Sequence, residues 1–99
     1  MPMIFEEAIR SQDELPREIG LLDYDGGIRV MVRYLGTGAY AFITRGGEGE
    51  YALAIYDYID ENGVRTPNRL LLFRGFRAVE SIMGFLSGLI EEPFTSFKY

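Results

Sequence analysis

Arginine and aromatic side chains are interleaved through the middle of the chain, and they are the residue types on which binding chemistry would rest. The sequence has nine arginines and one lysine, and five of the arginines and seven rings fall between Arg29 and Phe73. Rings stack on unpaired bases, and guanidinium groups stack on rings and hold phosphates. This pattern favours a module that binds single-stranded nucleic acid.

Catalysis has little support in the composition. The chain has no histidine and no cysteine, so a catalytic triad would need an unusual base. Two carboxylate pairs remain, Asp57 with Asp60 and Glu48 with Glu50, but the first precedes a turn and the second lies in a glycine loop. The glycine-rich stretches lack the Gly-Lys-Ser/Thr ending of a phosphate loop. We therefore expect no enzymatic activity, no metal and no other cofactor.

Length and charge limit the class of protein further. Ninety-nine residues make one small domain, and a net charge of −5 argues against a protein that coats duplex DNA. No apolar run is long enough to span a membrane, and the first residues lack the pattern of a secretory signal. We expect an intracellular protein of the cytoplasm or nucleoid.

Turn signals and period-two alternation divide the centre of the chain into strands. Gly26-Gly27 and Asn62-Gly63 are turn signals, and β-branched and aromatic residues alternate between the turns. The predicted strands are 28–34, 39–45, 51–59 and 69–73.

A change to helical spacing follows Gly75. One apolar stripe predicts a helix over Arg77–Glu92, which Pro93 ends. The expected fold class is therefore α+β: a four-stranded antiparallel sheet followed by one long C-terminal helix packed on one face. The stripe consists of Val79, Ile82, Met83, Leu86, Leu89 and Ile90.

Three segments are expected along the chain. Residues 1–25 form an acidic N-terminal arm with a possible short helix, which Ser11 or Asp13 would cap and Pro16 would begin. Residues 26–92 form the single β-β-β-β-α domain. Residues 93–99 form an aromatic C-terminal tail.

Alternation also assigns the two faces of the predicted sheet. The aliphatic set needs the helix as its cover, so the arginine and aromatic set faces away from the core. That second face is too aromatic to be left wholly in water. The predicted nucleic-acid-binding residues are Arg29, Arg33, Tyr40, Phe42, Tyr56, Tyr58, Arg65, Arg69 and Phe73.

Two alternatives remain open for this aromatic face. Its rings would pack in a dimer interface, or they would be covered by the N-terminal arm. The competing function is a non-enzymatic, homodimeric interaction module whose aromatic face binds a protein partner.

The far side of the predicted helix carries small residues four apart. Each glycine inside a helix costs up to about 1 kcal/mol relative to alanine, and close approach of a second helix would offset that cost. The predicted dimer interface is Arg77, Ser81, Gly84 and Gly88, although tolerated surface glycines remain the alternative.

The segment from Leu53 to Glu92 resembles the transcriptional coactivator family called positive cofactor four. The likeness rests on the run from Tyr56 to Phe73: Tyr58 stands where the family has tryptophan, Pro67 where it has proline, and Arg69 where it has arginine. The resemblance implies four strands and a helix, a homodimer, and binding to single-stranded or melted DNA. A transcription or replication protein is implied as a further partner.

A more distant likeness is to the small single-strand-binding proteins of hyperthermophilic archaea, which use an arginine and aromatic cleft on a sheet. It implies the same class of function. Apart from these resemblances, the sequence leaves DNA and RNA both open as the ligand.

Overall fold

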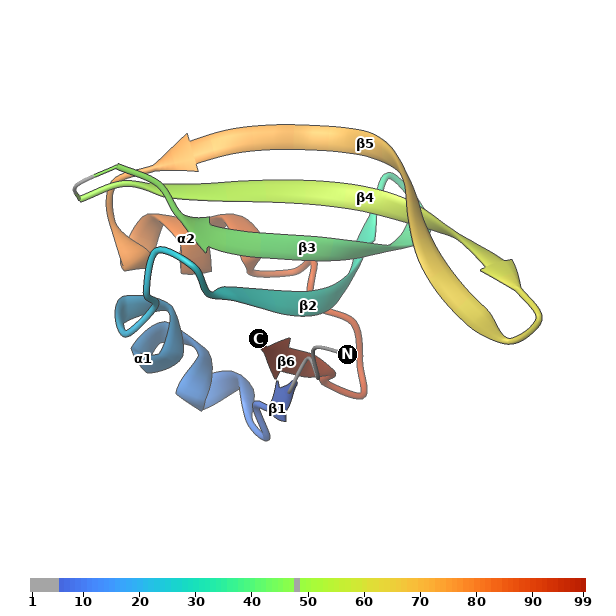
Figure 1. Ribbon diagram of the computed structural model, residues 1–99, viewed down its shortest axis with the longest axis horizontal. Coiled ribbons are helices and arrows are strands. Elements are labelled where there is room, and N and C mark those ends of the chain that lie inside the picture. Colours follow the sequence, from blue (N-terminus) through green and yellow to red (C-terminus); the bar gives the residue numbers. More distant parts are fainter. Residues whose placement is uncertain (1–5, 48) are drawn as a thin grey trace.

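An antiparallel sheet with two short helices against one of its faces makes up the fold (Figure 1). The structure is a computed structural model, which describes residues 6–47 and 49–99. Within these residues the sheet has six strands in the spatial order β1-β6-β2-β3-β4-β5. In chain order the elements are β1 (Glu7–Ala8), a short 3-10 helix (Gln12–Glu14), α1 (Leu15–Gly20), β2 (Gly27–Tyr34), β3 (Thr37–Arg45), β4 (Tyr51–Glu61), β5 (Val64–Phe76), α2 (Val79–Leu86) and β6 (Ser96–Lys98).

The core lies between the sheet and the helices, and it is built from the alternating aliphatic residues. Ile28, Val30 and Val32 of β2 are fully buried, as are the residues of β3 and β4 that face the same way. The period of two therefore predicted the buried face of these three strands. That face is covered by Leu15 and Ile19 of α1, by Leu22 just after α1, and by Ile82 and Leu86 of α2; none of these is more than 1% exposed.

The segment predicted as an N-terminal arm contributes to this core. Ser11 caps the 3-10 helix by accepting a hydrogen bond from the Asp13 amide at 3.1 Å, and Pro16 stands in the first turn of α1. A proline fits there because the first amides of a helix have no partner inside the helix. Residues 15–22 then supply three side chains to the core.

The prediction of a four-stranded sheet followed by one long C-terminal helix is wrong. The sheet has six strands among the described residues, and α2 ends at Leu86. Gly88, just beyond the end of the helix, has a φ of +83°, the left-handed conformation that glycine adopts without strain after a helix. No helix among the described residues is long and apolar enough to cross a membrane.

The residues after α2 return to the sheet instead of extending the helix. The Arg33 amide donates to the Leu89 carbonyl at 2.8 Å, and the Glu91 amide donates to the Met31 carbonyl at 3.2 Å. The chain then forms β6, which pairs with residues 28–30 of β2 and with β1. The free edge of β2 thus binds the predicted end of the helix and the aromatic tail, because buried backbone groups need partners.

The β4–β5 hairpin is longer than predicted and irregular. Tyr56 pairs with Leu70 and Ile55 with Leu72, so Leu71 is an extra residue in β5. Such a bulge changes the alternation, and it turns Leu70 to the face of Tyr56 rather than to the core. Strict alternation from residue 69 to residue 73 would place Leu70 and Leu72 together on the core face; this holds for Leu72 but is wrong for Leu70. Beyond the bulge the hairpin curves away from the plane of the sheet (Figure 1).

The four residues predicted for a dimer interface are all exposed, but they do not lie on one helix. Arg77 precedes α2, Ser81 and Gly84 lie on it, and Gly88 follows it. The positive φ of Gly88 is a local reason for that glycine. At Gly84 a Cβ atom would meet no other atom within 4 Å. Helix-to-helix association remains a prediction.

We expect Gly84→Ala to raise the free energy of unfolding by about 0.5–1 kcal/mol, because alanine is the better helix former and has room there. Gly88→Ala is the matched control: alanine in the left-handed conformation costs about 1–2 kcal/mol, so this variant should lose stability. Urea unfolding measures both changes, and light scattering gives the oligomeric state. A less stable Gly84→Ala variant that also dissociates would show that a second helix packs on Gly84.

Candidate nucleic-acid interface

The face of the sheet opposite the helices gathers most of the predicted aromatic residues. Directly opposed residues of antiparallel strands point to the same face. Arg29 opposes Phe42, Met31 opposes Tyr40, and Tyr40 opposes Tyr56. Five of the nine predicted binding residues, Arg29, Tyr40, Phe42, Tyr56 and Tyr58, therefore form the centre of this face, which we call the aromatic face.

The rings on this face pack against one another. The centroids of Tyr40 and Tyr58 are 5.2 Å apart, those of Tyr40 and Phe42 are 6.1 Å apart, and those of Phe42 and Tyr56 are 5.8 Å apart. Edge-to-face and tilted contacts of this length are favourable for aromatic pairs. Tyr40 is only 8% exposed, so it supports the cluster from beneath and offers little ring surface to a ligand.

Arg29 is held between two rings and a carboxylate. Its guanidinium carbon lies 5.2 Å from the Tyr40 centroid and 5.0 Å from the Phe97 centroid. Its Nη2 atom forms an ion pair with Glu6 at 2.8 Å. These contacts fix the guanidinium plane on the face and neutralise its charge.

Phe97 was missed as a site residue. It comes from β6, and its pairing opposite Arg29 places it on the aromatic face. The sequence signal was the alternation of Ser96, Phe97 and Lys98, which is too short to distinguish a strand from a tail.

Arg65 approaches the same face from the curved hairpin. Its guanidinium carbon lies 4.9 Å from the Tyr58 centroid, and its side chain reaches a cleft of about 350 Å³ over the end of the sheet. Arg29 and Arg65 thus line the same cleft. The cleft is lined by Arg29, Met31, Tyr40, Arg65, Glu91, Glu92, Pro93, Thr95 and Phe97.

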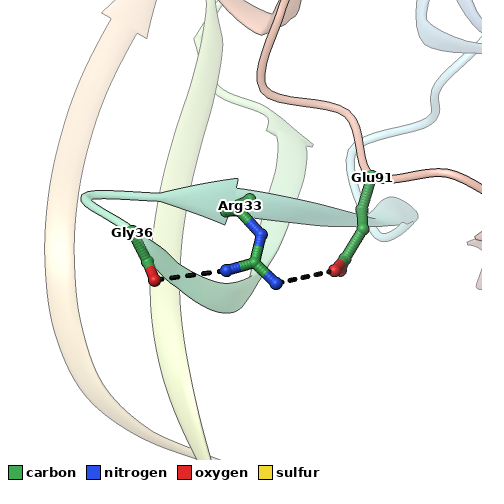
Figure 2. A network of polar contacts seen from close by, with 3 residues as sticks. All are labelled: Arg33, Gly36 and Glu91. Carbon is green, nitrogen blue, oxygen red and sulfur yellow. Dashed lines mark hydrogen bonds and ion pairs between the residues drawn. The ribbon is translucent and has the colours of Figure 1, made fainter.

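Arg33 lies outside this cleft, in a polar network of its own. Its Nη1 atom donates to the Gly36 carbonyl at 3.2 Å, and its Nη2 atom pairs with Glu91 at 3.4 Å (Figure 2). Its guanidinium group therefore links the turn after β2 to the segment after α2.

Arg69 is bound to Asp57 instead of facing the rings. The Arg69 amide donates to Oδ1 of Asp57 at 2.7 Å, and Nη2 lies 3.2 Å from Oδ2. Asp57 stands between Tyr56 and Tyr58 in β4, so alternation turns its side chain to the opposite face. The structure thus does not bring Arg69 into the cleft.

Phe73 remains on the aromatic face but outside the cleft. It pairs with Ala54 at the edge of the sheet, where it is 66% exposed.

The charge of the cleft is balanced. Two guanidinium groups face the carboxylates of Glu91 and Glu92 in its lining. Beside it, a smaller hollow is lined by Glu6, Arg29, Phe42 and Tyr99, and burial raises the pKa of the Tyr99 hydroxyl above its usual value. Among the described residues no cluster of acidic side chains could hold a metal ion.

Comparison of the chain with protein-family models, curated proteins and solved structures finds no match. The resemblance to the positive cofactor four family rests on the residues quoted above. Its implied layout of four strands and a long helix differs from the observed fold.

Gly38 sets the position of Tyr58, and this contact is testable. A Cβ atom on Gly38 would lie 2.9 Å from the Tyr58 hydroxyl oxygen, so in Gly38→Ala either this hydroxyl group or the strand must shift. We expect the variant to lose about 1 kcal/mol of stability through overpacking. Gly75→Ala is a matched strand control, because its Cβ atom would meet only the Tyr51 carbonyl oxygen, at 3.9 Å. Equal stability of the two variants in urea would contradict the contact.

Proposed function

We propose that the protein binds single-stranded nucleic acid in the cleft between Arg29, Phe97 and Arg65. The observation that supports this most directly is that two guanidinium groups and the partly exposed ring of Phe97 line one hollow on a sheet face. Guanidinium planes and aromatic rings are the groups on which splayed bases stack.

The size of the cleft suggests how much of a strand it takes. Its volume of about 350 Å³ is at the small end of the range of ligand sites, about 300–1,000 Å³. It suits one base and its sugar, with the neighbouring nucleotides passing over the hairpin. Arg29 and Phe97 form the stacking surface, and exposed Arg65 holds a phosphate.

Charge distinguishes single strands from duplexes in this proposal. Duplex binding depends on neutralising many phosphates, and the cleft carries as many carboxylates as guanidinium groups. A base that stacks in the cleft depends less on phosphate contacts. The proposal includes an intracellular location, where single strands arise during transcription and replication, and a protein partner from one of those processes.

A second candidate function is protein binding by the aromatic face. It is favoured by the ion pairs that already occupy three of the predicted arginines: Arg29 with Glu6, Arg33 with Glu91, and Arg69 with Asp57. A face with neutralised cations and half-buried rings resembles the core of a protein interface.

Fluorescence anisotropy with labelled oligothymidine and oligouridine tests the proposed function. We expect micromolar binding that weakens by about threefold between 50 and 200 mM salt, because one phosphate contact gives a slope of about −0.7 for single strands. Duplex DNA of equal length should bind more weakly. No binding of either oligonucleotide at 50 mM salt would leave the protein-binding function as the explanation of the aromatic face.

Two variants locate the binding site. Phe97→Ala should weaken binding by about tenfold, since one stacked base contributes about 1–3 kcal/mol. Arg65→Ala should weaken it and remove most of the salt dependence. Arg17→Ala, an exposed arginine on α1, is the control with the same change of charge. If Arg69→Ala proves as harmful as Arg65→Ala, the cleft is not the site.

A further inference from the structure

β5 is the outer strand of the sheet, and it is long. Over Val64–Phe76 its one neighbour in the sheet, among residues 6–47 and 49–99, is β4. The residues at 64–70 and 73–75 are exposed. The outer edge of such a strand presents unpaired amide and carbonyl groups, which another extended chain can pair with.

The regular part of this edge runs from Leu72 to Phe76. There β5 pairs with β4 residue by residue, whereas the bulge at Leu71 and the proline at position 67 interrupt the strand before it. A proline and a bulge both oppose strand addition, so they leave residues 72–76 as the segment that can accept a partner.

The two faces of this segment differ in chemistry. Phe73 lies on the aromatic face with Leu70 beside it, and they are 66% and 47% exposed. Arg74 opposes the buried residue Leu53, so it points to the helical face, where its guanidinium carbon lies 5.0 Å from the Phe76 centroid. A strand added along residues 72–76 would therefore meet Phe73 on one face and Arg74 on the other.

The charged side chains of β5 itself are all arginines. Residues 64–77 contain four arginines and no acidic residue, although the whole chain has a net charge of −5. Arg69 is paired with Asp57, but Arg74 forms no ion pair with any described residue. The edge is complementary to a negatively charged strand.

We propose that the β5 edge over residues 72–76 binds an extended acidic peptide in which acidic and large apolar residues alternate. Backbone hydrogen bonds to the edge provide the affinity, and the alternation provides the specificity. An acidic residue lies beside Arg74, and an apolar residue lies beside Phe73. A second copy of β5 fits poorly, because symmetric pairing places arginine beside arginine.

Fluorescence anisotropy with a labelled nine-residue peptide of alternating aspartate and leucine or phenylalanine tests this proposal. We expect micromolar binding to the full chain. The same peptide with N-methyl groups on alternate residues keeps its charge but cannot pair along an edge, and it should not bind. A third peptide with lysine in place of aspartate should also fail.

Variants of the protein then locate the peptide. Arg74→Glu should weaken binding by about tenfold, because it replaces a favourable cross-strand pair with a repulsive one. Arg10→Glu, an exposed site near β1, is the control and should bind as the parent protein does. Circular dichroism confirms that both variants are folded. Amide hydrogen exchange gives a second readout, since bound peptide should protect β5 and leave β2 and β3 unchanged.

Three results would overturn the proposal. One is equal binding of the N-methylated peptide, which would mean that charge alone attracts it. Another is no binding of the acidic peptide by the folded protein. The third is a dimer of the parent protein that Phe73→Asp dissociates, which would make a second copy the occupant of this edge.

Discussion

Burial of alternate aliphatic residues beneath α1 and α2 is the constraint on which the rest of the structure depends. Ile28, Val30 and Val32 cannot leave the core without turning every other residue of β2 inward, because a strand alternates strictly. Arg29 is therefore obliged to face away from the helices, and its cross-strand neighbours follow. The residues of the aromatic face are thus those that alternate with the core residues, and the helices do not cover them.

The edge of β2 decides how that face is completed. Its hydrogen-bonding groups are satisfied by residues that come after α2, through Leu89, Glu91 and β6. Pairing there brings Phe97 against Arg29 and places Glu91 and Glu92 in the cleft. Lys98, on the opposite side of the same strand, forms an ion pair with Glu18 of α1 at 3.1 Å. One short strand therefore links the candidate site to the helical layer.

Local periodicity predicted the strands and their buried faces, which depend on residues close in the sequence. It did not predict the features that depend on pairing between distant segments. The four central strands and the buried faces of β2 and β3 follow from alternation alone. In β4 alternation also groups Ile59 with the buried Leu53 and Ile55, but Ile59 is 41% exposed, in the part of the hairpin that extends past the core. The apolar stripe from Val79 to Ile90 fits a helix, yet Gly88 ends the helix and Ile90 instead bridges to Val32. The bulge at Leu71 and the Asp57–Arg69 contact are likewise outcomes of pairing two strands, so the place of Arg69 could not be read from β5 by itself.

Neutralisation of the arginines explains how an acidic chain can present cationic groups on two surfaces. On the aromatic face, Arg29 and Arg33 are each paired with a carboxylate, so their net charge is small. A ligand there would interact with the planes of the guanidinium groups by stacking more than with their charge. At the β5 edge, Arg74 has no carboxylate partner among the described residues, and its charge remains effective at short range. Under the two proposals the surfaces therefore select different chemistry: flat, stackable groups in the cleft, and an acidic extended peptide along the edge. Leu70 and Phe73 of the edge strand lie on the same face of the sheet as the cleft, so the two proposed sites share one face.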